Sequence, residues 1–480
     1  MVSIDEIKSV ASNYFYCTDD LVVQELPFKN RKALLIYFNT MTDIQWLEQS
    51  FVNVISQEEA HKNNFSITEC LSEFPLKQLN SITEGLPDLL TGSYIVIVEN
   101  KDLHYFLGNA PKSNTRSIEE PINDRALRGS HAGFIEDLTT NINLIRYQAK
   151  IKELNIKKNH TIGKTLKKDV ALLYIEGKAS PKLIKGVTKK LLSIKQDLIS
   201  SPGSLDELLQ DPKKSFFPQL LYTERPDTVV GNLHEGRIII LIEGNPTALI
   251  MPVSFFSFMQ STDDYNSHFV LGSFLRIIRT IALFISVFFP SIYISLIAFH
   301  FEIIPQPLII SVKSSLQNIP YPPIIEAMIM EFTIELIREA GIRLPAPIGQ
   351  TIGIVGGLVI GEAVVNAGLV SNIMIIVVAI TAVSSFVIPN PEMSSVIRLL
   401  RFPLMLAAAT FGLIGVILCT FTIVMHLVKL ESFGMPYLSP VAPFDRKKLK
   451  DTVIRFPMWL LEKDTIFTSN KLKTKKTKKS

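Results

Sequence analysis

Long apolar runs in residues 275–428 limit what this chain can fold into. Three of them, at 280–299, 371–389 and 402–428, contain no Asp, Glu, Lys or Arg, and a fourth at 346–370 contains only Glu362. About 20 apolar residues are enough to cross the hydrocarbon of a bilayer. Four such runs in one region do not fit the core helices of a soluble protein. The sequence therefore predicts a transmembrane helical domain over residues 271–430.

A fifth segment, at 320–341, has helical periodicity but carries charge. Glu331, Glu335 and Arg338 fall within about 60° of one another on a helix that turns by about 100° per residue. This stripe predicts either a helix at the membrane surface or one that faces a watery vestibule. About four crossings, with this segment interfacial or re-entrant, make the simplest fold, and about six result if the segment also crosses.

The flanking charges set the orientation. Arg276 and Arg279 precede the first apolar run, and residues 429–480 hold 13 Lys and Arg against 5 Asp and Glu. Positive residues stay on the cytoplasmic side of a membrane, so we expect both termini there and an even number of crossings. The lysine-rich end either contacts anionic membrane lipid or remains solvated.

Residues 1–270 contain an internal repeat. Lys32 begins "KALLIYFNTMTDIQWLEQSFVNVI" and Asp169 begins "DVALLYIEGKASPKLIKGVTKKLL", so that Ala33 aligns with Ala171. The stretches at 91–108 and 235–252 also match, and there Gly92 aligns with Gly236. Each block reads as a strand, an amphipathic helix and then a strand pair. The alternative is chance similarity between common strand patterns.

These patterns predict a membrane protein with an N-terminal cytoplasmic α/β region of two related subdomains. The first covers residues 1–127, and the second, with a connecting helix capped by Ser130, covers 128–270. The helical domain follows at 271–430, and a basic cytoplasmic tail occupies 431–480. The connecting helix can join the two subdomains or pack against a neighbouring subunit.

The sequence argues against several classes of function. The three cysteines are far apart and odd in number, and the eight histidines are scattered, so no metal site is predicted. Phosphate-binding glycine loops and hydrolase nucleophile motifs do not appear. We therefore expect no catalytic residues, no cofactor and no enzyme activity.

No basic patch carries interleaved aromatic residues, which argues against nucleic-acid binding. The first eleven residues do not read as a signal peptide.

Charged residues in the soluble half suggest contacts rather than chemistry. Glu224, Arg225 and Asp227 lie in "TERPD" and are expected to form an ion-pair corner that holds the second subdomain, with ligand binding as the weaker alternative. Arg128 and Glu136 either contact a neighbouring subunit or pair within the fold.

Glycines repeat every fourth residue in "GQTIGIVGGLVIGEAVVNAGLVS", at Gly349, Gly353, Gly357 and Gly361. Such a small-residue stripe lets neighbouring helices approach closely in lipid. Glu362 lies about 100° round from Gly361 and shares a face with Asn366. It therefore faces polar company or water, or it is protonated or paired with Arg338 or Arg343 of a neighbour.

Several long stretches resemble the A subunit of GerA-type spore germinant receptors. They include "RGSHAGFIEDLTTNINLIR" at 128–146, "FPQLLYTERPDTV" at 217–229, "EAGIRLPAPIGQTIGIVGGLVIGEAVVNAGLVS" at 339–371 and "SFGMPYLSPVAP" at 432–443. The resemblance extends from about residue 30 to about residue 460, through most of the chain.

This resemblance implies an integral protein of the endospore inner membrane that works with two partners. One is a transporter-like B subunit that senses nutrients, and the other is a lipoprotein C subunit. The A subunit is implied to self-associate, as a pentamer, into a nutrient-gated cation channel that starts germination. A secondary transporter and a non-conducting scaffold subunit of the same complex are the alternatives.

On this interpretation the glycine helix moves when the channel opens. The constriction is assigned to Val364 and Val365 with the polar Glu362 and Asn366, because a carboxylate ring favours cations. Strain from the soluble half is expected to pass through residues 254–269 into Arg276 and Arg279.

Overall fold

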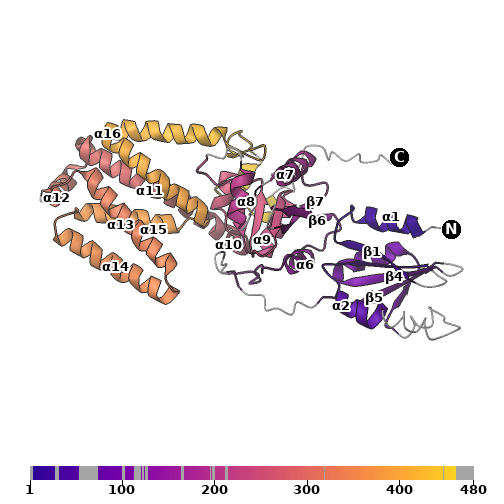
Figure 1. Cartoon of the computed structure of the whole chain (residues 1–480). Helices are drawn as coiled ribbons and strands as arrows, with labels where there is room; N and C mark the ends of the chain where they lie inside the picture. The colour runs from indigo at the N-terminus through magenta and orange to yellow at the C-terminus, as the bar shows by residue number, and fades with distance from the viewer. Residues whose placement is uncertain are drawn as a thin grey trace.

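The chain folds into two α/β halves followed by a helical bundle (Figure 1). The computed structural model describes residues 4–27, 32–52, 74–99, 103–112, 120–121, 124, 128–163, 167–194, 196, 201–210, 215–317, 319–446 and 448–460. One side of the helical bundle lies against the second α/β half, and the long helices at the beginning and the end of the bundle reach that side (Figure 1).

The first half is a five-stranded antiparallel sheet of order β1-β2-β4-β5-β3. Its strands are β1 (Leu21–Pro27), β2 (Lys32–Phe38), β3 (Lys77–Leu79), β4 (Ser93–Glu99) and β5 (Leu103–Asn109). Its helical segments are α1 (Ile4–Tyr14), α2 (Ile44–Trp46), η1 (Leu47–Val52), α5 (Ile82–Gly85) and η2 (Leu86–Thr91).

The second half repeats this architecture with strand order β6-β7-β9-β10-β8. Its strands are β6 (Leu154–Ile162), β7 (Lys168–Ile175), β8 (Leu221–Thr223), β9 (Ile238–Ile242) and β10 (Ala248–Met251). Its helices are α6 (Leu138–Ala149), α7 (Pro181–Ser193), α8 (Pro202–Leu209) and α9 (Pro226–His234). The sequence-aligned alanines, Ala33 and Ala171, lie on β2 and β7, which hold the same place in the two sheets.

The aligned glycines also adopt the same backbone conformation. Gly92 precedes β4 with φ +88°, and Gly236 precedes β9 with φ +86°. Only glycine enters this left-handed region without strain. A Cβ would also lie 2.7 Å from a Pro111 backbone atom at Gly92 and 2.8 Å from the Lys178 carbonyl at Gly236. The two glycines therefore make equivalent turns into the two central strands, as the internal repeat predicts.

The central strands are covered on both faces, which explains their continuous apolar sequence. On β2, Leu34 and Ile36 belong to one buried cluster, while Leu35 and Tyr37 belong to the cluster on the other face. A strand buried on both faces loses the alternation of polar and apolar residues that marks a half-exposed strand.

A buried ion pair joins the two halves. Arg146 of α6 donates to both oxygens of Asp20, each at 2.6 Å, and both side chains are almost fully buried. Thr18 and Thr40 also donate to Asp20, and the guanidinium of Arg146 lies 4.4 Å from the ring centre of Phe38. The connecting helix therefore joins the subdomains. Its cap is Asp137, which accepts from the Thr140 amide at 2.7 Å, so the predicted cap Ser130 was wrong.

Burial alone would raise the pKa of Asp20, but Arg146 and the two threonine hydroxyls outweigh it and hold the pKa below the usual 3.8. A carboxyl whose pKa is lower in the folded than in the unfolded state stabilises the fold above its unfolded pKa. That contribution is lost as the pH falls below 3.8 and through the folded pKa.

The remaining helices form the bundle. They are η3 (Phe255–Met259) and α10 (Thr262–Asn266) at its entrance, then α11 (Phe269–Ala298), η4 (Phe301–Ile303), α12 (Gln306–Leu316), α13 (Pro323–Arg343), α14 (Ala346–Asn366), α15 (Asn372–Phe386) and α16 (Pro391–Lys429). In the described part of the chain, α11 and α16 are both long and apolar enough to cross a membrane. The number of crossings, four or six, stays a prediction.

The predicted uninterrupted span at 402–428 is wrong, because α16 breaks at Gly412. This glycine has φ +62° and ψ −143°, outside the helical region. A straight helix of 39 residues would be about 58 Å long. Yet residues at both ends meet the second half: Glu392 lines a cavity with Tyr222, and His426 Nε2 lies 3.0 Å from Ser215 Oγ. α16 is therefore two limbs that run in opposite directions, as Figure 1 shows.

α13, predicted to lie flat or re-enter, packs inside the bundle against α11, α14, α15 and α16. Glu326 and Glu331 on this helix are buried. Glu331 of the charged stripe therefore faces protein within the chain, and its arginine partner is described below.

Residues 431–446 of the predicted tail also pack against the fold. They include the strand pair β11 (Glu431–Ser432) and β12 (Met435–Pro436). Ser432 Oγ donates to the Gln219 carbonyl at 2.9 Å, and the buried Tyr437 hydroxyl donates to the Pro218 carbonyl at 2.7 Å. The lysine-rich end, residues 461–480, lies outside the described residues.

Replacing Arg146 by Met is expected to lower the free energy of unfolding of the soluble half by about 3–5 kcal/mol, because Asp20 would stay buried without its cation. The fluorescence of Trp46, which lies in the first half, reports this unfolding in a urea titration of the full chain.

Lys8→Ala is the matched control, since Lys8 pairs with Glu25 at 2.5 Å on the surface. An exposed pair contributes less than about 1 kcal/mol. Equal losses in the two variants would contradict the role given to Asp20 and Arg146.

Candidate functional site

Buried ion pairs connect α13 to the first limb of α16. Arg401 donates to Glu331, and both side chains are nearly fully buried. Arg401 also donates to the carbonyl and hydroxyl oxygens of Ser286 on α11, at 2.9 and 3.1 Å. One guanidinium thus holds three helices together at the centre of the bundle.

A second pair lies one turn further along α13. Arg398 Nε lies 2.9 Å from Glu335, and the guanidinium of Arg338 lies 5.1 Å from the ring centre of Phe386 on α15. Glu331 and Glu335 are four residues apart, and Arg401 and Arg398 are three apart, so each set lies on one helix face. Our sequence interpretation did not single out these arginines, although their matching spacing was visible. The vestibule role of Glu331, Glu335 and Arg338 stays a prediction.

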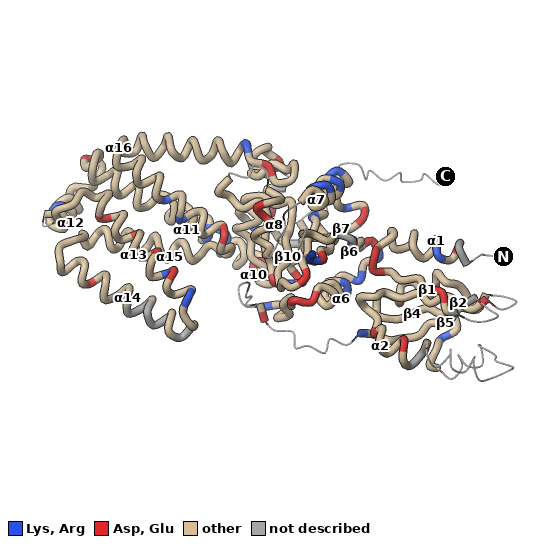
Figure 2. Tube along the Cα trace, in the orientation of Figure 1, with Lys and Arg blue, Asp and Glu red and all other residues tan. Residues whose placement is uncertain are grey.

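Figure 2 shows how few charges the bundle carries, and α14 has a single one among its described residues. α14 packs mainly against α13. The two helices touch near their shared turn, where a Cβ on Gly349 would lie 2.5 Å from the Gly341 carbonyl oxygen. Gly349 is therefore a packing residue within one chain.

The other glycines of the repeat are different. Apart from the backbone of α14 itself, no atom of the described residues lies within 4 Å of a Cβ added at Gly353, Gly357 or Gly361. The structure therefore separates the predicted packing stripe into one glycine that is used within the chain and three that face open space. Glu362 and Asn366 are exposed, and Val364 and Val365 are half-buried, all on the last two turns of α14.

A buried carboxylate lies where the soluble half enters the bundle. Asp264 on α10 is fully buried and accepts from Arg276 Nε at 2.9 Å and from Arg279 Nη1 at 2.7 Å. A Cβ on Gly272 would lie 2.8 Å from the Asp264 carbonyl oxygen, so α10 and α11 touch along their backbones. We name the residues 261–279 the elbow. The two arginines expected to receive strain from residues 254–269 are indeed bonded to that segment, through Asp264.

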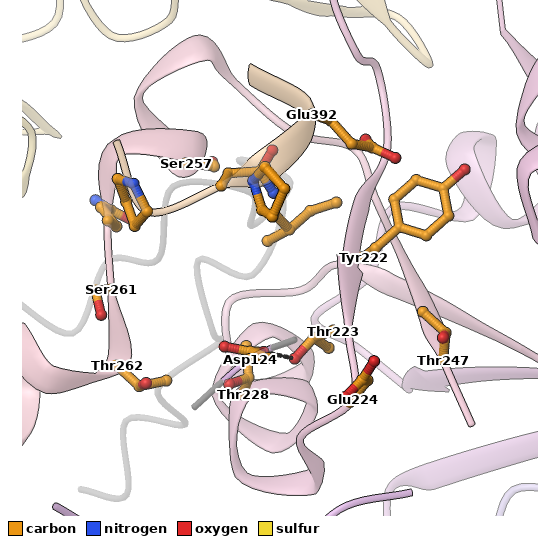
Figure 3. Close-up of a pocket in the computed structure, with 15 residues that line it drawn as sticks. Asp124, Tyr222, Thr223, Glu224, Thr228, Thr247, Ser257, Ser261, Thr262 and Glu392 are labelled. Carbon is orange, nitrogen blue, oxygen red and sulfur yellow. Dashed lines mark hydrogen bonds between the residues drawn. The ribbon is translucent and has the colours of Figure 1, made fainter. Parts of the chain in front are cut away.

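A cavity of about 450 Å³ opens between the second half and the turn that leads into α16 (Figure 3). Tyr222, Thr223 and Glu224 on and after β8 line one side, and Glu392 at the start of α16 lines the other. Thr223 donates to Asp124 at 2.6 Å. The lining includes further hydroxyl and amide side chains, from Thr228, Thr247, Ser257, Gln260, Ser261, Thr262 and Asn390.

The electrostatics of this cavity are acidic. Asp124, Glu224 and Glu392 contribute carboxyl groups, and no Lys or Arg belongs to the described lining. Burial raises the pKa of the Asp124 carboxyl, although the Thr223 hydroxyl and Arg225 oppose this. A raised pKa favours the neutral carboxyl, so this lining attracts positively charged groups and repels anions where its carboxyls are ionised, above that pKa.

Metal chemistry finds no support among the residues described. No group of three or more His, Cys, Asp or Glu in those ranges could hold a metal ion.

The soluble residues singled out from the sequence fall in two places. Arg225 is buried and bonded to Asp227 at 2.6 and 3.0 Å, so these two lie together at the start of α9. Glu224 lines the cavity instead. Arg128 and Glu136 are exposed, and their backbone carbonyls accept from Asn266 and Gly244. Subunit contacts by Arg128 and Glu136 stay a prediction.

Comparison with known proteins identifies the relatives of this architecture. The model of the GerA family, described as Bacillus/Clostridium GerA spore germination protein, matches residues 6–466. This chain belongs to the GerA family.

Two spore germination proteins are similar to most of this chain. Spore germination protein A1 of Bacillus subtilis (strain 168) is 40% identical over 447 residues, which cover 92% of this chain and 91% of that protein. Spore germination protein GerLA of Bacillus cereus is 35% identical over 450 residues, covering 92% and 91%. The crystal structure of the N-terminal domain of the A subunit of the Bacillus megaterium spore germinant receptor GerK3 is 25% identical, with a TM-score of 0.40, and covers 53% of this chain and 96% of that domain.

The Arg401→Met variant tests the central ion pair of this GerA protein. Removing Arg401 leaves Glu331 as a buried charge without a partner, which is expected to destabilise the bundle by about 3–5 kcal/mol. The measurement is the thermal unfolding temperature of the full chain in detergent.

Arg343→Met is the control, because Arg343 pairs with Glu339 four residues away in an exposed position, where such pairs contribute less than about 1 kcal/mol. The double variant Glu331→Leu/Arg401→Met removes both charges and is expected to recover most of the lost stability. A double variant as unstable as Arg401→Met would argue against the uncompensated charge as the cause.

Proposed function

We propose that this chain is the A subunit of a germinant receptor in the inner membrane of the endospore. Copies of it assemble into a ring, with a pentamer as the expected size, and the ring conducts cations when a nutrient is sensed. The nutrient binds to a transporter-like B subunit, and a lipoprotein C subunit completes the receptor. Membership of the GerA family supports the germination role.

The open glycine face of α14 is the observation that carries the channel proposal. In the part of the chain that the structure describes, no residue outside the backbone of α14 comes within 4 Å of a Cβ placed on Gly353, Gly357 or Gly361. Three glycines in register lower the helical propensity of this segment, and close packing in lipid is a physical benefit that offsets this loss. A helix of the next copy supplies that packing in the proposed ring.

The proposed topology has six crossings. α11, α13, α14 and α15 each cross once, and the two limbs of α16 cross in opposite directions. The reversal at Gly412 and the packing of α13 within the bundle support this count. An even number returns the chain to its starting side, which agrees with the cytoplasmic position proposed for both termini.

The proposed gate lies at the end of α14. Val364 and Val365 form the apolar constriction, and Glu362 with Asn366 provides polar groups beside it. Movement of the soluble half reaches the bundle through Asp264 and its two arginines. The rigid α13–α16 ion pairs leave α14 as the helix that can shift.

Gly357→Leu is expected to reduce the assembled fraction roughly tenfold, because the leucine separates the helices that pack on this face. Gly357→Ala keeps a small residue and is expected to assemble almost normally. Analytical ultracentrifugation of the detergent-solubilised chain measures both. Normal assembly of Gly357→Leu would contradict packing between copies through this face.

Glu362→Gln is expected to lower the ratio of cation to anion flux roughly tenfold, because the ring loses its carboxylates. Nutrient-triggered ion release from spores that carry the variant measures this ratio. Glu207→Gln makes the same change on the exposed face of α8 and is expected to have no effect.

Unchanged flux and selectivity in Glu362→Gln would remove this residue from the pore. If purified rings conduct no ions at all, the chain is a scaffold subunit, and saturable uptake of a solute by the chain alone would instead identify a transporter.

A further inference from the structure

The described end of the chain is fastened to the elbow. Asp451 accepts from Arg276 Nη1 at 2.7 Å and from the Tyr265 hydroxyl at 2.7 Å, and its carbonyl accepts from Gln260 at 2.8 Å. Arg455 donates to the carbonyl oxygens of Asp264 and Ser267. These bonds connect residues 451–455 to both α10 and α11, about 180 residues away in sequence.

The opposite side of this segment is apolar and exposed. We name residues 448–460, which contain the turns η5 (Lys448–Asp451) and η6 (Met458–Leu460), the clasp. Trp459 is 78% exposed, and Ile454, Phe456 and Leu460 are exposed beside it in sequence. The hydrogen bonds to the elbow do not explain why these four large apolar side chains are exposed.

This apolar surface continues onto α11. The ring centre of Trp459 lies 5.9 Å from that of Phe269, the first residue of α11, and the planes meet edge to face. Val270, Leu271 and Phe274 are exposed on the same first turns. Because α11 is apolar enough to cross a membrane, the clasp borders the surface of the bundle that lipid would cover.

The charge of the chain beyond the clasp favours one kind of occupant. Residues 461–480 contain seven lysines, at 463, 471, 473, 475, 476, 478 and 479, against two acidic residues, at 462 and 464. Lysines next to a membrane-inserted aromatic residue are attracted to anionic lipid headgroups. Tryptophan is itself enriched at the level of the headgroups.

We propose that the clasp is an interfacial membrane anchor, in which Trp459 and its apolar neighbours enter the headgroup region of an anionic bilayer. The net positive charge of residues 461–480 favours an anionic bilayer over a neutral one. Asp451 and Arg455 keep the elbow bonded to this anchor. The lipid surface thereby fixes the position of Asp264 relative to the bilayer. This inference rests on the membrane location in the proposed function and adds a lipid contact to it.

The chain contains two tryptophans, Trp46 and Trp459, so single-tryptophan variants give a direct test. Trp46→Phe leaves Trp459 as the only emitter in full-length protein reconstituted into phosphatidylcholine vesicles with phosphatidylglycerol. Lipids brominated near the headgroup are expected to reduce its emission roughly twofold, as for a tryptophan at the interface. Aqueous iodide is expected to quench it weakly.

Trp459→Phe is the matched control, because it leaves Trp46, which lies in the soluble half. Its emission is expected to be quenched by iodide and unaffected by brominated lipid. Replacing the seven lysines by glutamine in the Trp46→Phe background, or omitting phosphatidylglycerol, is expected to weaken the lipid quenching of Trp459.

A third variant, Trp46→Phe/Trp459→Phe/Phe284→Trp, separates the two proposals. Phe284 is exposed on α11, 15 residues and therefore about 22 Å beyond Phe269. If deeply brominated lipid quenches Trp at 284 but no lipid quenches Trp459, the anchor is wrong and the membrane location stands. If neither responds, the membrane location fails. Protection of Trp459 from both lipid and iodide would show that protein covers the clasp, and would also overturn the anchor.

Discussion

Buried carboxylate–arginine pairs hold the parts of this chain in a fixed relation, and Asp264 is the central one. It bonds to Arg276 and Arg279 where the soluble half enters the bundle. Asp20–Arg146 does the same between the two α/β halves, and Glu331–Arg401 does so within the bundle. A buried charge without its partner costs about 3–5 kcal/mol. Each joint therefore tolerates few arrangements, and the chain behaves as a series of rigid bodies.

α14 is the exception to this rigidity. Its one close backbone approach is the turn at Gly349, and the three later glycines face open space in the described chain. Its single carboxylate, Glu362, is exposed. A helix with no ion pair to its neighbours among the described residues can tilt more readily than helices joined by ion pairs. This contrast gives a physical reason why a moving part and a contact between copies would fall on the same helix.

Local patterns predicted the repeated α/β halves and most helices of the bundle, because apolar periodicity and turn glycines act within short windows of sequence. Gly92 and Gly236 are the best example, since one backbone requirement recurs at both. The errors involve contacts between distant residues. The sequence left open whether α13 lies at the membrane surface or faces water. Its packing inside the bundle was not predicted, because Arg401, the partner of Glu331, lies 70 residues away. The break at Gly412 was missed because glycine is common in membrane helices. The reversal becomes visible in the contacts that the two ends of α16, at Glu392 and His426, make with the second half.

The reversal at Gly412 also bears on how the chain can enter a membrane. Residues 402–428 contain no Asp, Glu, Lys or Arg, so the turn between the two limbs of α16 carries no charged side chain. The pair of limbs can partition from the translocon as a single unit, without moving a hydrophilic loop through hydrocarbon. Arg398 and Arg401 at the base of the first limb need the carboxylates of α13 as partners. In the proposed membrane topology, insertion of this hairpin therefore depends on α13 being in place first, which is the order in which the ribosome delivers them.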